Sequence, residues 1–296
     1  MLLYDQDQSK LEGARHRIEQ MDDWLTTEIP EPKASYGELQ CAPDLALLDR
    51  NADLILESIR EELAAKVALF QFLSGAASRG AILCSCTSGL SISTMGTLSG
   101  YPSQLVGTHF WSPPHLMPLV EVVVGTRSGE ETAQTALQFC RSIGKQPVRV
   151  NVDVPGFIGN RMLHALWREA IYIVERGIAS AEDVDTVAKL TIGLRQGIMG
   201  PLEHMDLAGL DLVHAIHKYL LADLAANHTP GELLEQKVRD GHLGVKNGQG
   251  FYDWTRRNSE ALIQARDRQV VRELRRLREE NLPTSKDFPR PKGTEI

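Results

Sequence analysis

The sequence feature that most constrains the fold is an acid placed inside an apolar run. Residues 105–124 read LVGTHFWSPPHLMPLVEVVV, with one apolar run that ends at His109 and a second that carries Glu121 in its middle. Short apolar runs bounded by turn residues predict buried strands. An unpaired carboxylate in such a strand is costly, so Glu121 requires a partner, and His109 is the nearest candidate. A carboxylate behind an imidazole fixes the tautomer and raises the basicity of the ring, so the pair predicts a general base.

The composition places the chain among ordinary globular proteins. Of its 296 residues, 42% are hydrophobic and 24% are charged, and the length allows two domains with separate cores. A net charge of −7 argues against a general nucleic-acid or membrane-surface binder. The four cysteines show neither a CxxC pair nor a Cys/His metal spacing, so we expect no metal site and a reducing compartment. The sequence shows no signal-peptide pattern, membrane-length run or C-terminal address, which favours a cytoplasmic protein.

The first half of the sequence alternates between strand and helix patterns. Helical periodicity is expected at residues 11–21, at 61–73 and from residue 92, and a loop rich in Pro, Gly and Ser at residues 27–43. Strands are expected at the two apolar runs of residues 105–124 and at residues 2–4, 54–59, 81–86 and 147–152. Near-continuous apolar strands that alternate with helices predict an α/β fold with a doubly wound parallel sheet.

The pattern changes at Asp153–Gly156, after which the periodicity is helical. We expect helices at residues 160–175, from Ser180, and at residues 201–225 and 259–280, with a glycine-rich loop at residues 241–254. Residues 283–296 have the composition of a disordered tail. The sequence therefore predicts three parts: an α/β domain at residues 1–154, an all-α domain at 155–254, and an amphipathic helix with a flexible tail at 255–296.

Five motifs, in this order, resemble the L-3-hydroxyacyl-CoA dehydrogenase family, including its lambda-crystallin and L-gulonate 3-dehydrogenase branch. They are Ser88, HFWSP at 109–113, LVEV at 119–122, PGFIGNR at 155–161 and GQGFY at 248–252. The resemblance covers nearly all of residues 2–254. It implies a Rossmann-like NAD-binding domain before the helical domain and NAD-dependent oxidation of a 3-hydroxyl group. It also implies a place in fatty acid metabolism and a homodimer built through the helical domain.

The same resemblance implies a catalytic set. His109 corresponds to the catalytic base, and Glu121 to the acid that orients it. Ser88 corresponds to a serine near the substrate oxygen and nicotinamide, and Asn160 to an asparagine that hydrogen-bonds the substrate. Each residue also has a structural interpretation: a buried histidine with a satisfied hydrogen bond, a turn hydroxyl, or a helix cap.

The positions that correspond to cofactor contacts in the family are Asp5, Glu61, Lys66, Ser88, Ser112 and Lys246. Asp5 ends the first apolar run. In this type of fold, the acid that hydrogen-bonds the adenosine ribose has the same position at a strand end. Taken alone, Asp5 is typical of a turn, and Glu61 with Lys66 is typical of a solvated helix face. Ser112 and Cys86 stand where the family commonly has asparagine, and a serine cannot reproduce the paired donor and acceptor of an amide.

The largest departure from the family concerns the dinucleotide cradle. A site of this type uses a strand, a GxGxxG turn and a helix ahead of the strand that ends in the ribose-binding acid. Because Asp5 matches that acid, the glycine turn would precede Met1, and no GxGxxG occurs in the 296 residues. Two interpretations stay open: the true start lies upstream, or this chain binds NAD poorly or not at all.

The substrate is also open between alternatives. Acyl-CoA members of the family carry several lysines in the helix after the ribose-binding acid, whereas this chain has Lys10, Arg15, His16 and Arg17 followed by acids. The first hypothesis is a short-chain 3-hydroxyacyl-CoA, and a variant of it is a free 3-hydroxy acid of the gulonate or carnitine kind. The second hypothesis is a non-catalytic, truncated relative of the crystallin type. An intact Ser88, His109, Glu121 and Asn160 set favours the enzyme.

The missing cradle generates a prediction about cofactor affinity. Adding an in-frame strand, GxGxxG turn and helix ahead of Met1 should strengthen NADH binding by at least about tenfold, because each charge-assisted contact to the pyrophosphate is worth about 1.5–3 kcal/mol. Fluorescence titration of both proteins with NADH measures the difference. Equal dissociation constants would show that the cradle is not needed.

Overall fold

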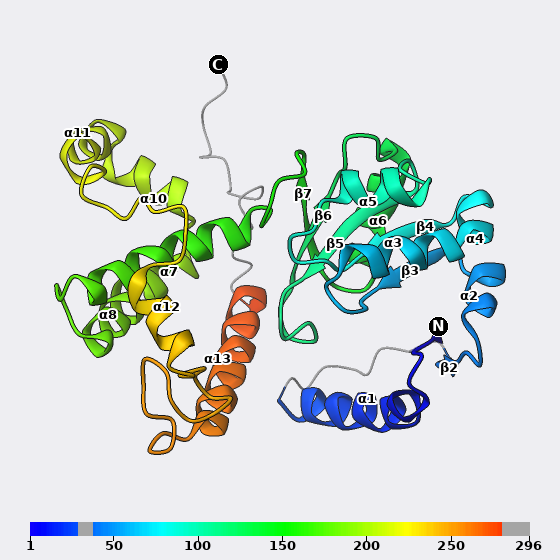
Figure 1. Cartoon of the computed structure of the whole chain (residues 1–296), viewed down its shortest axis with the longest axis horizontal. Coiled ribbons are helices and arrows are strands. Elements are labelled where there is room, and N and C mark those ends of the chain that lie inside the picture. The colour runs from blue at the N-terminus through cyan, green and yellow to red at the C-terminus, as the bar shows by residue number, and fades with distance from the viewer. Residues whose placement is uncertain (29–37, 280–296) are drawn as a thin grey trace. The chain divides into compact units, whose positions relative to one another are not determined.

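The computed structural model describes residues 1–28 and 38–279 (Figure 1). The chain divides into two compact units, one made of Met1–Arg161 with Asp267–Ile296 and the other of Met162–Arg266. In the first unit the strands are β1 (Leu2–Leu3), β2 (Gln40–Cys41), β3 (Leu54–Glu57), β4 (Ile82–Ser85), β5 (Leu105–Phe110), β6 (Leu119–Val123) and β7 (Gln146–Val150). Its helices are α1 (Gln8–Glu28), α2 (Leu45–Asn51), α3 (Leu63–Phe72), α4 (Ser74–Ser78), α5 (Ile92–Ser99) and α6 (Glu130–Ser142).

The main sheet of the first unit has the order β3-β4-β5-β6-β7. The strands β3, β4 and β5 are parallel to one another, whereas β6 runs antiparallel to β5, and β7 is parallel to β6. The prediction of a uniformly parallel sheet is therefore wrong for the last two strands. The reason is that residues 111–118 are too few for a crossover connection, so the chain turns back beside the strand it has just left.

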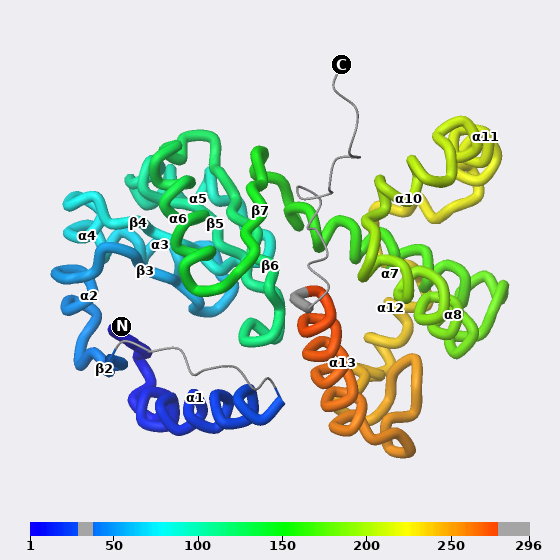
Figure 2. The backbone as a smooth tube through the Cα atoms, turned by 180° about the vertical axis from the view of Figure 1, so that it is seen from behind, coloured from blue at the N-terminus to red at the C-terminus, as the bar shows by residue number. Residues whose placement is uncertain are grey.

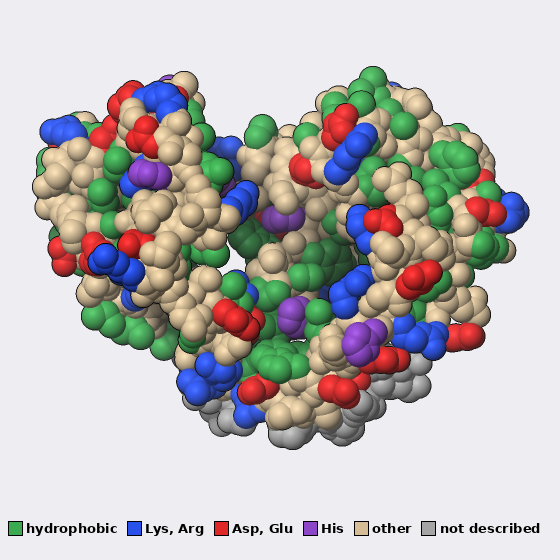
Figure 3. Space-filling view, turned by 60° about the horizontal axis from the view of Figure 1, so that its bottom comes forward, with side chains coloured by type: hydrophobic (Ala, Val, Ile, Leu, Met, Phe, Trp, Pro, Cys, Tyr) green, Lys and Arg blue, Asp and Glu red, His purple; other side chains and the backbone are tan. Residues whose placement is uncertain are grey.

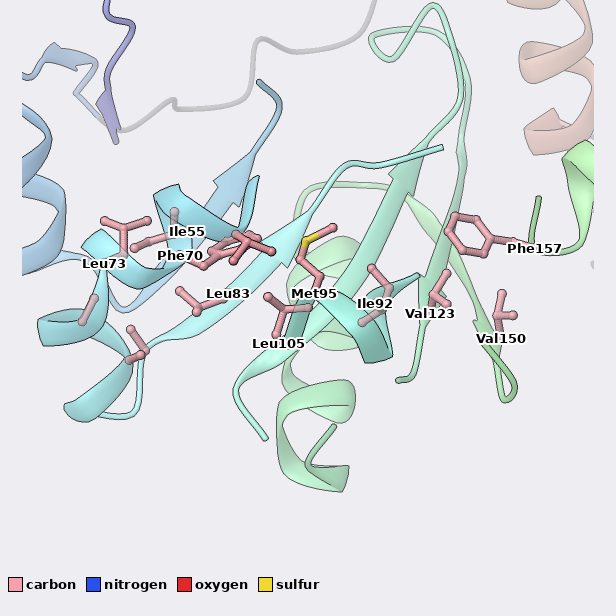
Figure 4. Packing of buried hydrophobic residues seen from close by; sticks show 14 residues of the cluster. Ile55, Phe70, Leu73, Leu83, Ile92, Met95, Leu105, Val123, Val150 and Phe157 are labelled. Atoms are coloured by element: carbon pink, nitrogen blue, oxygen red, sulfur yellow. The ribbon is translucent and has the colours of Figure 1, made fainter. Parts of the chain in front are cut away.

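Apolar residues alternate between the two faces of this sheet and form two cores. On one face, Leu83, Leu105 and Val123 pack with Phe70 of α3 and Met95 of α5 (Figure 4). On the other face, the core includes Cys84, Val106, Val120 and Val122 of the strands and Ala133, Ala136, Leu137 and Cys140 of α6. The prediction of an α/β, doubly wound, Rossmann-like fold is confirmed, and the sequence patterns did not reveal helices α2, α4 and α6.

The N-terminal segment differs from the expected loop. Helix α1 extends to Glu28, and Gln40–Cys41 forms a second small sheet by pairing in parallel with β1. Residues 29–37, which belong to the predicted loop, lie outside the described residues. The pairing of β1 places Asp5 shortly after a strand end, as the apolar run at residues 2–4 predicts.

The second unit and the segments that join it are helical. The elements are α7 (Gly159–Glu175), α8 (Ala181–Val187), the π-helical turn η1 (Ala188–Gly193), α9 (Leu194–Gln196), α10 (Pro201–Ala208), α11 (Leu210–Leu220), α12 (Glu232–Arg239) and α13 (Ser259–Glu279). The predicted cap is present, since the Ser180 hydroxyl accepts the backbone N–H of Asp183 at 3.1 Å. The expected single helix at residues 201–225 is wrong, because Gly209 has φ of 97°, which ends α10 before α11 starts. The predicted disordered tail lies outside the described residues.

The helices of the second unit bury little of their apolar surface. In the chain as described, α7, α8, α10, α11 and α12 contain no fully buried residue. Helix α11 lies away from α12 in both backbone views (Figures 1 and 2). Of the described helices, none combines the length and the apolar composition needed to cross a lipid bilayer.

Candidate active site

The candidate residues gather at one edge of the main sheet. Because β3, β4 and β5 are parallel, their carboxyl ends meet at this edge, and β6 starts there because it runs the other way. Ser88 follows β4, and His109 lies near the end of β5. The carboxyl ends of strands are where open α/β sheets bind ligands. The register of the antiparallel pair places His109 directly opposite Glu121.

His109 and Glu121 form a buried pair. The His109 Nδ1 atom lies 2.8 Å from Glu121 Oε2, and the two residues are 5% and 0% exposed. An ionised carboxylate only accepts hydrogen bonds, so Nδ1 carries the proton and donates it. The neutral ring then has its lone pair on Nε2, which is the atom needed for proton abstraction.

Three further donors reach the Glu121 carboxylate. Trp111 Nε1 donates to Oε2 at 3.2 Å, and the backbone N–H groups of Ile158 and Gly159 donate to Oε1 at 2.9 and 3.0 Å. Burial raises the pKa of Glu121, but the hydrogen bonds from His109, Gly159 and Ile158 outweigh burial and hold the pKa below its ordinary value near 4.5. Glu121 is therefore a fixed negative charge.

The backbone donors depend on an unusual turn. Gly156 and Phe157 both have positive φ values, 76° and 49°, and this turn carries the chain back so that the next two N–H groups reach Glu121. A side chain at Gly159 would overlap the Trp111 ring, so only glycine leaves room for the indole at this position. The PGFIGN segment thus supplies two of the hydrogen-bond donors that surround Glu121.

Ser88 and Asn160 are brought into contact. Asn160 Nδ2 donates to the backbone carbonyl of Ser88 at 3.1 Å. On the other side of the same residue, the Ser88 N–H donates to Glu61 Oε1 at 3.0 Å, and Glu61 also accepts the Thr87 hydroxyl at 2.5 Å. Burial raises the pKa of Glu61, but these hydrogen bonds and Lys66 outweigh it, so the pKa is lowered overall.

Lys66 is buried, contrary to the solvated helix face considered for it. Its side chain is 1% exposed, and its Nζ atom lies 2.6 Å from Glu57 Oε1, 3.2 Å from the Ile59 carbonyl and 3.4 Å from Glu61 Oε2. These three acceptors match the three donors of an ammonium group. As a cofactor contact, Lys66 stays a prediction.

Three candidates remain: Asp5, Ser112 and Lys246. Asp5 accepts the N–H of Asp7 at 2.9 Å, and Lys10 lies 3.9 Å from its other oxygen. Ser112 is exposed after β5, and Lys246 is exposed in the second unit. Within residues 1–28 and 38–279, none of the three hydrogen-bonds to His109, Glu121, Ser88 or Asn160, and their roles stay predictions.

The residues present fit part of an NAD molecule. Asp5 presents a carboxylate that is 37% exposed shortly after a strand end, which suits ribose hydroxyls. Glu61 is 47% exposed at the carboxyl edge beside Ser88. A glycine-rich turn that would cradle the pyrophosphate does not occur between residue 1 and residue 28 or between 38 and 279. The ribose end of NAD is therefore the part for which the described residues offer a matching group, the Asp5 carboxylate.

Sequence reasoning missed several members of the site. No sequence pattern predicted the hydrogen bonds to Glu121 from the Trp111 indole N–H group or from the backbone N–H groups of Ile158 and Gly159. Glu57, however, stands inside the apolar run LILESI at residues 54–59, so the argument that found Glu121 applies to it equally. Cys84 is fully buried, and burial raises the pKa of the nearby Cys86 thiol to about 11.

Comparison with known proteins identifies the family. The profile described as "3-hydroxyacyl-CoA dehydrogenase, NAD binding domain" matches residues 1–154, and the profile of the C-terminal domain of the same family matches residues 156–254. The fold, the paired His109 and Glu121 and these matches define an NAD-dependent oxidoreductase. The chain belongs to the 3-hydroxyacyl-CoA dehydrogenase family.

Its relatives act on different substrates. The chain is 33% identical over 272 residues to 5-formyl-3-hydroxy-2-methylpyridine 4-carboxylate 5-dehydrogenase of Mesorhizobium japonicum, which covers 92% of this chain and 88% of that protein. It is 39% identical over 210 residues to a probable 3-hydroxybutyryl-CoA dehydrogenase of Bacillus subtilis, which covers 71% and 72%. It is 36% identical over 223 residues to L-carnitine dehydrogenase of Pseudomonas putida, which covers 74% and 70%.

Two solved structures resemble the chain in fold and sequence. A crystal structure of 5-formyl-3-hydroxy-2-methylpyridine 4-carboxylic acid 5-dehydrogenase has a TM-score of 0.86 at 33% identity, with 94% of this chain and 90% of that chain covered. FadB2 of M. tuberculosis has a TM-score of 0.66 at 30% identity, with 85% and 89% covered.

The lowered pKa of Glu121 generates a prediction about stability. A group whose pKa is lower in the folded state adds stability above its unfolded pKa, and this stability is lost as pH falls through the folded pKa. At neutral pH we expect Glu121→Gln to cost about 3–5 kcal/mol, because it breaks a buried pair. The cost should shrink as pH falls below about 4.5, the ordinary value of the group. Urea unfolding of both proteins across this range tests it, and a cost that is independent of pH would contradict it.

Proposed function

We propose that this chain interconverts a 3-hydroxy compound and its 3-oxo form, with His109 as general base and Glu121 as the acid that orients it. The observation that supports this most strongly is the buried contact of 2.8 Å between His109 Nδ1 and Glu121 Oε2. The contact leaves Nε2 as the basic atom of the ring.

The proton transfer follows from this geometry. NAD, when bound, supplies the hydride acceptor for the substrate carbon. His109 Nε2 takes the hydroxyl proton in the oxidative direction and returns it in the reductive direction. The imidazolium formed by the transfer lies against the Glu121 carboxylate, whose charge stabilises it. Since four donors lower the proton affinity of Glu121, the proton stays on the imidazole ring.

The remaining predicted residues take positioning and binding roles in this proposal. Ser88 and Asn160, which are hydrogen-bonded to each other, hold the substrate oxygen beside the base. Asp5, Glu61, Lys66, Ser112 and Lys246 are proposed to serve the cofactor, with Lys66 buried beneath Glu61.

Two observations favour a free acid over an acyl-CoA as substrate. The helix that would meet the CoA phosphates has its arginines engaged, because Arg15 donates to the Leu39 carbonyl at 3.0 Å and Arg17 to the Lys10 carbonyl at 2.7 Å. The relative with a TM-score of 0.86 is also named for a pyridine carboxylate. The short-chain acyl-CoA, and with it fatty acid metabolism, remains the second candidate because of the relatives named as 3-hydroxybutyryl-CoA dehydrogenases. A cytoplasmic location is also proposed, since all four cysteines are free.

The base generates the central prediction. We expect His109→Ala to lower kcat by about 10²–10⁴-fold, because general base catalysis contributes a factor of that size. The dissociation constant for NADH should change little. Turnover is measured with acetoacetyl-CoA and with free acetoacetate, so the same assay compares the two substrate classes.

The matched control is His16→Ala, since His16 lies on the exposed face of α1 and contacts Gln20. It should leave kcat unchanged. Full turnover by His109→Ala would place the base elsewhere, and an absence of turnover in the unmodified protein with either probe would contradict the proposed reaction.

We also propose that the chain is a homodimer that pairs through its helical unit. Helix α10 exposes Leu202 and Leu207 at 72% and 74%, helix α11 exposes Leu210 at 61%, and hydrophobic side chains reach the surface of this unit (Figure 3). A cavity of about 730 Å³ in the same unit is lined mainly by apolar side chains, among them Trp167, Ile171 and Phe251. Monomers rarely expose apolar surface of this kind, and in the proposed dimer a second copy of the chain covers it.

The dimer generates a separate prediction. Leu207→Asp places a charge on the proposed interface and should shift the protein from dimer to monomer in sedimentation velocity. Leu98→Asp, at a residue of α5 that is 53% exposed in the first unit, is the control and should leave the dimer intact. A monomeric unmodified protein would contradict the proposal.

A further inference from the structure

A second acid is buried at the carboxyl edge of the sheet. Glu57 ends β3 and is 2% exposed. Its Oε1 atom accepts the N–H of Ile59 at 2.7 Å and the ammonium of Lys66 at 2.6 Å, and its Oε2 atom accepts the Ser85 hydroxyl at 2.6 Å. The carboxylate therefore joins the end of β3, the end of β4 and helix α3.

Lys66 links Glu57 to a second carboxylate, that of Glu61. Its Nζ atom is 3.4 Å from Glu61 Oε2, a longer distance than the 2.6 Å to Glu57. An ammonium group buried to this degree needs a close counter-charge, and Glu57 supplies it. Glu57 and the Ile59 carbonyl hold the Lys66 ammonium group in place. The Glu61 carboxylate therefore interacts with a cation whose position is fixed.

Glu61 in turn holds the turn after β4. Its Oε1 atom accepts both the Thr87 hydroxyl and the Ser88 N–H. The Thr87 hydroxyl oxygen accepts the N–H groups of Gly89 and Leu90 at 3.3 and 2.9 Å, so the whole turn from residue 87 to residue 90 is tied to this carboxylate. The Ser88 carbonyl is held from the other side by Asn160.

We propose that Glu57 is a positioning residue, which acts through Lys66 and Glu61 to fix the Ser88 peptide at the candidate active site. This inference rests on the proposed function for its effect on catalysis, but its effect on Ser88 does not. Glu57 lies inside the sheet edge and touches neither Ser88 nor Asn160 among the contacts of the described residues. Because the three N–H donors of Lys66 are engaged, Lys66 affects the position of Ser88 through Glu61.

The test separates positioning from simple folding. Glu57→Gln keeps the shape of the side chain but leaves Lys66 buried without its nearest counter-charge, so stability and positioning should both fall. The double variant Glu57→Gln with Lys66→Met removes both buried charges and should recover much of the stability, since replacing a buried ion pair by apolar groups is often neutral. Glu61 still lacks its anchored cation in the double variant, so positioning should not recover.

Two measurements report positioning. Hydrogen exchange of the Ser88 amide needs no substrate, and it should be about tenfold faster in both variants than in the unmodified protein, because the bond to Glu61 opens more often. With the better of the two substrate probes, kcat should fall about 10–100-fold in both variants while KM changes less, because small misplacements have effects of this size. Glu61→Gln, which cuts the last link directly, should give the same fast exchange.

Glu130→Gln is the matched control, since Glu130 pairs with Arg149 at 2.6 Å on the exposed surface and, among the described residues, its side chain bonds to Gln134 and Arg149 and not to Ser88. It should leave both measurements unchanged. Recovery of Ser88 exchange and kcat together with stability in the double variant would overturn the proposal and leave Glu57 as a folding residue. An unmodified protein without turnover would contradict the proposed function alone, because Ser88 exchange would still decide the role of Glu57.

Discussion

The cost of burying a negative charge governs the carboxyl edge of this sheet. Glu57 and Glu121 are both buried there, and each is surrounded by donors from more than one element. Glu121 takes hydrogen bonds from β5, from the turn after β5 and from the segment that starts α7, while Glu57 takes them from α3, β4 and the turn after β3. Since a buried carboxylate that loses its donors destabilises the fold, these elements are held in one arrangement.

That arrangement is also the one that the proposed proton transfer needs. A carboxylate with fixed donors keeps its charge and cannot take the proton from its histidine. The same requirement explains the positive φ at Phe157 and the glycine at position 159, which let two backbone N–H groups and the Trp111 indole reach one side chain. In the proposed mechanism, stability and catalysis therefore depend on the same contacts at Glu121.

Much of the first unit could be predicted from the sequence, and the reasons are local. The acid in an apolar run identified Glu121 and its partner, because buried strands rarely carry a lone charge. The direction of β6 could not be predicted, since an apolar run reads the same for parallel and antiparallel strands. The break at Gly209 was hidden because helical periodicity continues from α10 into α11. The contact between Asn160 and Ser88 joins residues far apart in the chain, and only the resemblance to a family placed them together.

The antiparallel pairing of β5 with β6 places His109 opposite Glu121. His109 and Glu121 face each other through the hydrogen-bond ladder of the two strands, so their pairing does not depend on the length of residues 111–118. A surface turn between fixed strands tolerates insertion and substitution. Within that turn, Trp111 donates to Glu121 and Ser112 is a proposed cofactor contact, so residues 113–118 are the part of the connection that can change without removing a contact of the His109–Glu121 pair.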